Sequence, residues 1–177
     1  KEDRVLLRTR NDWVKKSGER VLVEDRGIAW RPGEKVHALD ISCTLTAADG
    51  DVLFDKEKHS FFGIRVADSI DVEDGGRVLN ANGEENEEGA MGKIADWVDY
   101  SGTVAGATVG VTLMNHPDNP PSPYFVRNYG TILSNFTYHE GYELKIGEKL
   151  TQHFRVLVHE GGIEDVDIGE YMWREGE

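Results

Sequence analysis

Apolar and polar residues alternate along most of this chain with a period of two. The alternation is clearest at residues 20–25, 37–47, 51–55, 60–68, 107–115 and 150–160. A period of two places successive side chains on opposite faces of an extended strand. These six segments are therefore predicted to be β-strands.

Turn signals separate the predicted strands at short intervals. They are DRG from 25, RPGEK from 31, ADGD from 48, EDGG from 73, NANGE from 80, YSG from 100 and HEGG from 159. Gly, Pro, Asn and Asp adopt the backbone conformations that tight turns need, so the connections are predicted to be antiparallel hairpins. The predicted fold class is all-β, an antiparallel β-sandwich of two sheets with alternate side chains pointing inward.

Helical periodicity is weak throughout. Twenty glycines interrupt the chain, and no apolar repeat of helical length occurs before residue 160. The C-terminal segment GIEDVDIGEYMWREGE, residues 162–177, is expected to form one short helix. In that helix Ile163, Val166 and Met172 would point inward, although Gly169 lowers its helical propensity.

The chain length fits one domain. A single sandwich of 177 residues, 1–177, is long enough to bury a core without disulfides. The strand pattern RVLLRTRNDWV begins at residue 4 with almost nothing ahead of it, which predicts an exposed sheet edge over residues 1–14. We therefore expect that strands upstream of this segment are missing. Because the first residue is Lys1 rather than Met, the sequence leaves open whether the protein is cytoplasmic or exported.

The net charge of −13 argues against some partners. Nucleic acids and anionic membranes both attract cationic surfaces, so neither is expected to bind. Residues 71–88 and 160–177 together carry −12 of this charge. They are predicted to be a solvated loop and a solvated tail, since DVEDGG lacks the spacing of a calcium-binding loop.

The sequence contains few patterns that indicate a metal site or a cofactor site. Cys43 is the one cysteine, which excludes an internal disulfide and a cysteine zinc site. The histidines are scattered, although His153 and His159 would share a face of one strand. No metal and no cofactor are predicted, and the apolar runs are too short to span a membrane.

The most unusual segment is LMNHPDNPPSPYFVRNYG, residues 113–130. It contains four of the five prolines in the chain. Each proline holds the residue before it in an extended conformation and reduces the entropy that a loop loses on binding. The segment is predicted to be either a rigid connection or a binding surface.

Four stretches together resemble a known family. They are LDISCTLTAADGDVLFDKEKHSFFGIRVADSI, GRVLNANGEENEEGAMGKIADWVDYSG, GVTLMNHPDNPPSPYFVRNYG and FRVLVHEGG. Their order and spacing resemble the PmoA-like family of the galactose-mutarotase-like supersandwich superfamily. The resemblance covers about residues 20–160 and implies a β-sandwich of carbohydrate-handling type. Because family members carry a further N-terminal portion, the chain resembles the C-terminal part only.

The family's name, methane oxygenase PmoA, is not expected to describe the activity, because a membrane oxygenase subunit needs spanning helices. Three segments carry the resemblance in detail: DYSG at 99–102, NHPDNP at 115–120 and YFVRNYG at 124–130. Asn115 and Asn128 stand where the family pattern has acids, and Phe125 stands where it has a histidine. These departures remove groups that transfer protons, so catalysis by this chain stays open.

The predicted site combines these segments with one strand. His116 is the catalytic candidate, as a general acid or base, with a sugar hydrogen bond or a structural cap as alternatives. The predicted ligand-binding residues are Arg65, Asp99, Tyr100, Asn119, Arg127 and Tyr129. Arg127 would either pair with Asp99 or loop carbonyls, or capture a substrate carboxylate or polyol. Arg65 would form either an internal ion pair or a site contact.

Three hypotheses of function follow. The first is a carbohydrate-active enzyme, or a degenerate member, that acts on a sugar or a sugar-derived small polar ligand. The second is a non-catalytic sugar-binding or structural sandwich, in which the same residues fix the loop to the sheet. The third is an interaction module, either a homo-oligomer or a sandwich whose missing N-terminal strands come from another chain.

Overall fold

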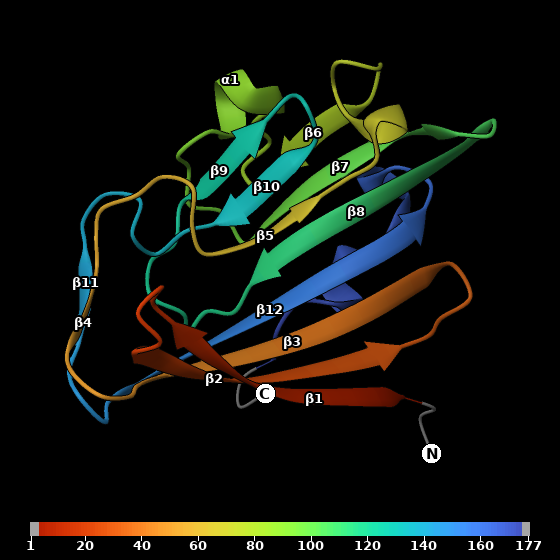
Figure 1. The fold of residues 1–177 in the computed structure, drawn as a ribbon. Coiled ribbons are helices and arrows are strands. Elements are labelled where there is room, and N and C mark those ends of the chain that lie inside the picture. Colours follow the sequence, from red (N-terminus) through yellow and green to blue (C-terminus); the bar gives the residue numbers. More distant parts are fainter. Residues whose placement is uncertain (1–3, 175–177) are drawn as a thin grey trace.

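Strands dominate the computed structural model, which describes residues 4–174 (Figure 1). The strands are β1 (Val5–Val14), β2 (Arg20–Arg31), β3 (Val36–Ala47), β4 (Val52–Phe54), β5 (Phe62–Arg65), β6 (Arg77–Asn80), β7 (Trp97–Val104), β8 (Ala107–Asn115), β9 (Tyr124–Arg127), β10 (Thr131–Ser134), β11 (Tyr142–Leu144) and β12 (Lys149–Glu160). The helical turns are η1 (Asp68–Ile70), α1 (Asn86–Ala90), η2 (Ile163–Asp165) and η3 (Ile168–Glu170). No helix within residues 4–174 is long and apolar enough to cross a membrane.

The strands form one large sheet and two small ones. The large sheet has seven strands in the order β1-β2-β3-β12-β8-β7-β6, and the small sheets are β5-β10-β9 and β11-β4. Neighbouring strands pair antiparallel in all three sheets, for example β12 with β3 and with β8. In Figure 1 the three-stranded sheet lies over the β6–β8 side, and β1 lies at the opposite edge. The predicted antiparallel β-sandwich is confirmed.

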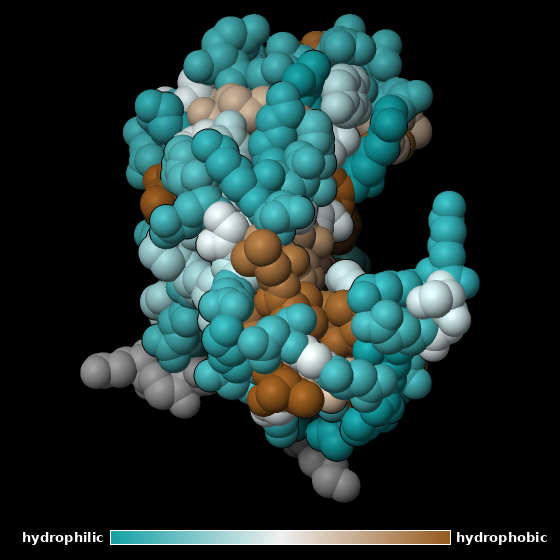
Figure 2. Space-filling model, turned by 60° about the vertical axis from the view of Figure 1, so that its left-hand side comes forward, coloured by the Kyte–Doolittle hydropathy of each residue, from teal (hydrophilic) through white to brown (hydrophobic). Residues whose placement is uncertain are grey.

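The inner face of the large sheet, which faces the three-stranded sheet, carries the main core. Alternate residues such as Ile41, Leu113 and Phe154 point to this face and pack against Val126 and Ile132 of the small sheet. Burial of each such side chain contributes about 1.5–3 kcal/mol. The sandwich is open, because Figure 2 shows a notch lined by apolar side chains beside this core.

The outer face of the large sheet is covered by the C-terminal segment, which we define as Ile163–Trp173. Ala38, Met114 and Leu157 form a small apolar cluster there, against which Ile168, Tyr171 and Met172 pack. The single short helix expected for this segment is wrong, since it contains only the separate turns η2 and η3. Packing along a sheet favours an extended course, and this contact outweighs a weak helical periodicity that Gly169 interrupts.

One of the two acidic segments is less solvated than predicted. Residues 71–88 are not only a loop, because they include β6, which is an edge strand of the large sheet. Asp71 in the same segment is buried, and its carboxylate accepts the backbone N–H of Asp74 at 2.9 Å. The acidic tail follows the outer face as far as Trp173, but its described acids are all exposed, as predicted: Glu160, Glu164, Asp165, Asp167 and Glu170.

The predicted edge at the N-terminal end is confirmed as β1, whose residues are all exposed. The buried Glu24 joins β1 to the sheet, because it accepts the indole N–H of Trp13 at 2.9 Å and the thiol of Cys43 at 3.2 Å. Arg26 donates to the same carboxylate at 2.6 Å. Burial opposes ionisation of Glu24, but these hydrogen bonds and the Arg26 charge outweigh it and lower its pKa.

The thiol of Cys43 tests this packing. Burial, together with the Glu24 carboxylate, raises the pKa of Cys43 to about 12. The thiolate is the reactive form, so labelling by a maleimide at pH 8 should be at least about 100-fold slower in the native protein than in urea. Equal rates in stopped-flow measurements would contradict a closed β1–β3 corner.

Candidate functional site

The structure distributes the sequence-predicted site residues over three places. Asp99 and Tyr100 lie inside the sandwich, Arg65, Arg127 and Tyr129 gather at the surface of the three-stranded sheet, and His116 and Asn119 lie on the proline-rich loop. His116 and Asn119 line one pocket together. The three groups are therefore considered one at a time.

Asp99 and Tyr100 are adjacent in β7 and point to opposite faces of the large sheet. The Tyr100 hydroxyl donates to the Arg127 carbonyl under the three-stranded sheet, and burial raises its pKa. On the outer face, Asp99 accepts the Thr112 hydroxyl at 2.8 Å and lies 2.9 Å from Nε2 of His159. Both side chains are fully buried, which favours a structural role; ligand contact by either stays a prediction.

Gly110 makes room for the Asp99–His159 pair. A Cβ at this position would lie 2.2 Å from Cε1 of the His159 ring, so only glycine leaves the space that the imidazole fills. Burial of His159 disfavours its charged form, but the hydrogen bond and charge of Asp99 outweigh burial and raise its pKa. Folding thus favours the protonated His159 ring beside Asp99, in a buried pair that joins β7 to β12.

Tyr129 lies between two arginines at the surface. The guanidinium carbons of Arg65 and Arg127 lie 5.7 Å and 5.1 Å from its ring centroid. Arg127 pairs with Glu87 of α1 at 3.2 Å, so Asp99 and loop carbonyls were the wrong partners for its side chain. Arg65 is 63% exposed and 3.7 Å from Asp68, which excludes an internal ion pair. These residues form an exposed cluster, and a ligand role for it stays a prediction.

Asn128, directly after β9, links the end of this strand to α1. Its side-chain oxygen accepts the backbone N–H of Glu87 at 3.0 Å, and the Glu87 carboxylate accepts the backbone N–H of Asn128 at 3.0 Å. The amide of Asn128 makes this reciprocal pair without adding a second negative charge next to Glu87. Asn128 therefore has a structural use at this strand end.

The proline-rich loop connects the two layers of the sandwich, from β8 to β9. Asn119 fixes it to β12, because its amide donates to the His153 carbonyl at 2.7 Å and accepts the His153 backbone N–H at 2.8 Å. The backbone N–H of His116 donates to the same carbonyl at 3.1 Å. The amide of Asn119 is thus engaged by the protein, and the loop is held against the sheet before any ligand arrives.

A pocket of about 380 Å³, which we call the proline-loop pocket, lies beside this loop. His116, Asn115 and Ser122 line it from the loop side, Asp96 from the start of β7 and Trp173 from the C-terminal segment. Three proline rings form much of its remaining wall, namely Pro117, Pro120 and Pro121. Rigid apolar walls with a few convergent polar groups are typical of small-molecule sites.

His116 lines this pocket, and one of its ring nitrogens has no partner among the described residues. Nδ1 accepts the backbone N–H of Asp118 at 3.0 Å, so a neutral imidazole must carry its hydrogen on Nε2. His116 is only 8% exposed, and Nε2 is buried with no hydrogen-bond partner among residues 4–174. The neutral ring therefore has a donor without an acceptor at Nε2, while Nδ1 already accepts a hydrogen bond and is not a free general base.

Trp173 and Asp96 complete the set of polar groups. The indole ring lies 4.7 Å from the His116 ring in an edge-to-face arrangement, and its Nε1 has no hydrogen-bond partner within the described part of the chain. Asp96 is exposed and contributes a carboxylate acceptor. Two ring donors and one acceptor are the groups that a polyhydroxylated ligand needs.

Sequence reasoning missed both of these residues. Asp96 directly precedes β7, three residues before the DYSG segment, and its carbonyl accepts the backbone N–H of Asn115, which continues the pairing of β7 with β8. A hairpin register drawn from the sequence would have placed it beside His116. Trp173 gave no such signal, because its place depends on how the C-terminal segment docks.

Metal binding has no obvious place in the described structure. No group of three or more His, Cys, Asp or Glu side chains within residues 4–174 is arranged to hold an ion. Burial, and then the neighbouring His116, lower the pKa of His153, which favours hydrogen bonding by the neutral ring of His153.

Comparisons with known proteins give a family and similar folds. The sequence profile of a family of unknown function (DUF6807) matches residues 1–172. No curated protein matches this chain. A crystal structure named "Putative aldose 1-epimerase" from Escherichia coli K12 has a TM-score of 0.41 and 12% identity, covering 91% of this chain and 67% of that chain. A variant of the GH36 α-galactosidase AgaA from Geobacillus stearothermophilus has a TM-score of 0.29 and 10% identity, covering 80% and 24%.

The Asp99–His159 pair predicts that part of the unfolding free energy depends on pH. Because the pKa of His159 is raised by folding, its contribution to stability is complete below the unfolded pKa of about 6.5 and is lost as pH rises through the folded value. The loss of unfolding free energy on His159→Gln should therefore be larger at pH 5.5 than at pH 9, as measured by urea denaturation.

The exposed His139 supplies the control for this measurement. His139→Gln should leave the pH profile of the wild type unchanged. A destabilisation by His159→Gln that is constant, or that grows with pH, would contradict an ion pair between His159 and Asp99.

Proposed function

The chain belongs to DUF6807, a family of unknown function, and we propose that it binds a saccharide or a sugar-derived ligand in the proline-loop pocket. The proposal takes the sugar-handling hypothesis from the sequence and gives it a location. The exposed Arg65–Tyr129–Arg127 cluster and the buried Asp99 and Tyr100 are outside this pocket.

One observation carries the proposal. The Nε2–H of His116 is buried at the pocket wall without an acceptor among the described residues. A buried donor left without a partner costs about 1–3 kcal/mol, so a nearly buried imidazole in this state favours a ligand that supplies the acceptor. The Nε1–H of Trp173, on the neighbouring wall, is also buried without a hydrogen-bond acceptor among the described residues.

The walls of the pocket support a sugar rather than another polar ligand. A sugar ring presents hydroxyls at its rim and C–H groups on its faces, so it needs donors, acceptors and apolar surface together. His116 and Trp173 supply the donors, Asp96 supplies the acceptor, and the proline rings supply the surface. Prolines and the Asn119 clamp hold the loop in place, which reduces the entropy lost on binding.

Acid–base chemistry on the bound sugar is the second candidate. The observation in its favour is Asp118, whose carboxylate lies 3.9 Å from Nδ1 of His116. Protonation of Nδ1 would exchange the hydrogen bond from the Asp118 backbone N–H for attraction to this carboxylate. The imidazolium would then be a general acid at Nε2, while Asp96 is the base available in the pocket. Turnover of the bound sugar would separate this function from binding alone.

A titration of neutral mono- and disaccharides tests the binding function. Trp173→Phe keeps a ring but removes the indole N–H, and His116→Phe keeps the ring contact but removes Nε2. Each should weaken binding about 3- to 30-fold in isothermal titration calorimetry, because a hydrogen bond in a desolvated site contributes about 1–2 kcal/mol. Thermal unfolding of each variant should confirm that it is folded.

Arg65→Ala provides the matched control, because this residue is exposed on the three-stranded sheet and does not line the pocket. Its affinity should equal that of the wild type. Failure of every saccharide to bind, or unchanged affinity in folded His116→Phe and Trp173→Phe, would contradict the proposed function.

A further inference from the structure

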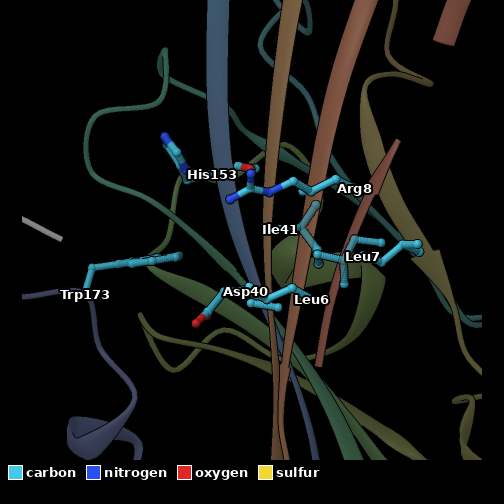
Figure 3. A pocket seen from close by; sticks show the side chains of 11 residues that line it. Leu6, Leu7, Arg8, Asp40, Ile41, His153 and Trp173 are labelled. Atoms are coloured by element: carbon cyan, nitrogen blue, oxygen red, sulfur yellow. The ribbon is translucent and has the colours of Figure 1, made fainter. Parts of the chain in front are cut away.

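A second hollow lies on the other side of Trp173, on the outer face of the large sheet (Figure 3). Its volume is about 210 Å³, and β1, β2, β3 and β12 form its floor. Trp173 lines both this hollow and the proline-loop pocket, so the two adjoin at the indole ring. We call it the Arg8 hollow, after the residue that extends into it from β1.

The Arg8 guanidinium distinguishes this hollow. Arg10 and Arg31 are paired with Asp25 and Asp40, at 3.4 Å and 2.9 Å. Arg8 has neither an ion pair nor a hydrogen-bond partner within the part of the chain that the structure describes. Figure 3 shows its side chain extending toward His153, with Trp173 facing the same space from the opposite side.

The one carboxylate in the hollow is already neutralised. Asp40 pairs through Oδ1 with Nε of Arg155 and through Oδ2 with Arg31. Its charge is therefore balanced by groups other than Arg8. In a protein of net charge −13, the hollow is a locally cationic place.

Neutral hydrogen-bonding groups line the same hollow as the exposed Arg8. Burial, and then His116, lower the pKa of His153, so its ring is neutral near pH 7 and can both donate and accept. Ser42 lies on the floor opposite Gly27, where a Cβ would lie 2.8 Å from the Ser42 hydroxyl oxygen. Glycine thus keeps this hydroxyl open to the hollow.

We propose that the Arg8 hollow binds the carboxylate of an acidic saccharide, a uronic acid, whose neighbouring unit occupies the proline-loop pocket. This inference rests on the proposed function and names its substrate class. Arg8 supplies a planar fork that matches a carboxylate in two parallel hydrogen bonds. One unpaired guanidinium among neutral groups balances one negative charge, which favours a carboxylate over a dianionic phosphate.

The test compares acids with their esters. Digalacturonate and glucuronosyl-xylose are titrated against the protein at low salt, each beside its methyl ester, which keeps the sugar and removes the charge. The acids should bind at least about tenfold more tightly than the esters, and added salt should reduce this preference. Arg8→Gln should abolish the preference while leaving the affinity for the esters unchanged.

Two variants make the result specific. Arg10→Gln lies on the same strand and face but removes an arginine that is paired with Asp25, so it should retain the preference for acids. His116→Phe should weaken the binding of acids and esters alike.

Equal affinity for acid and ester in the wild type would overturn the acidic substrate and leave the proposed function standing. Absence of binding by all four ligands would overturn the acidic substrate, and it would overturn the proposed function as well only if the neutral saccharides also fail to bind.

Discussion

The candidate site depends on one buried arginine. Arg155 of β12 pairs with Asp40, donates to the Tyr171 carbonyl at 2.6 Å and lies 4.0 Å from the Trp173 ring centroid. Removing one partner of a buried charge pair costs about 3–5 kcal/mol, because the other charge stays buried alone. Arg155 therefore holds the C-terminal segment on the sheet, and only this docking gives Trp173 its place between the two hollows.

The second constraint is the proline-rich loop between β8 and β9, which β12 also holds in place. Asn119 binds both backbone groups of His153, two residues before Arg155, so β12 fixes both walls of the proline-loop pocket. The loop backbone also sets the state of His116, because the N–H of Asp118 occupies Nδ1 and leaves the hydrogen of the neutral ring on Nε2. A rigid loop thus prepares a hydrogen-bond donor, and the prolines reduce the entropic cost of using it.

The fold followed from the sequence where alternation is clear. The predicted 107–115 coincides with β8, and 150–160 differs by one residue from β12. Two predicted turns were wrong, because DRG lies inside β2 and YSG lies inside β7. The short strand β9 was missed, since a four-residue segment buried at three positions shows no alternation. At the site, His116 and Asn119 were identified through their loop, whereas Trp173 depends on a tertiary contact. Asp99 and Tyr100 were expected beside His116 and Asn119 but lie elsewhere, because β7 points these two side chains to opposite faces of the large sheet.

The account places a saccharide against Trp173, and indole resonances of ¹⁵N-labelled protein test this most directly. Titration with a saccharide should shift the Trp173 signal saturably, after assignment by Trp173→Phe. The Trp13 signal should stay unchanged, because its N–H already donates to Glu24. A Trp173 signal that does not move at saturating ligand, or a shift confined to Trp13, would contradict the account.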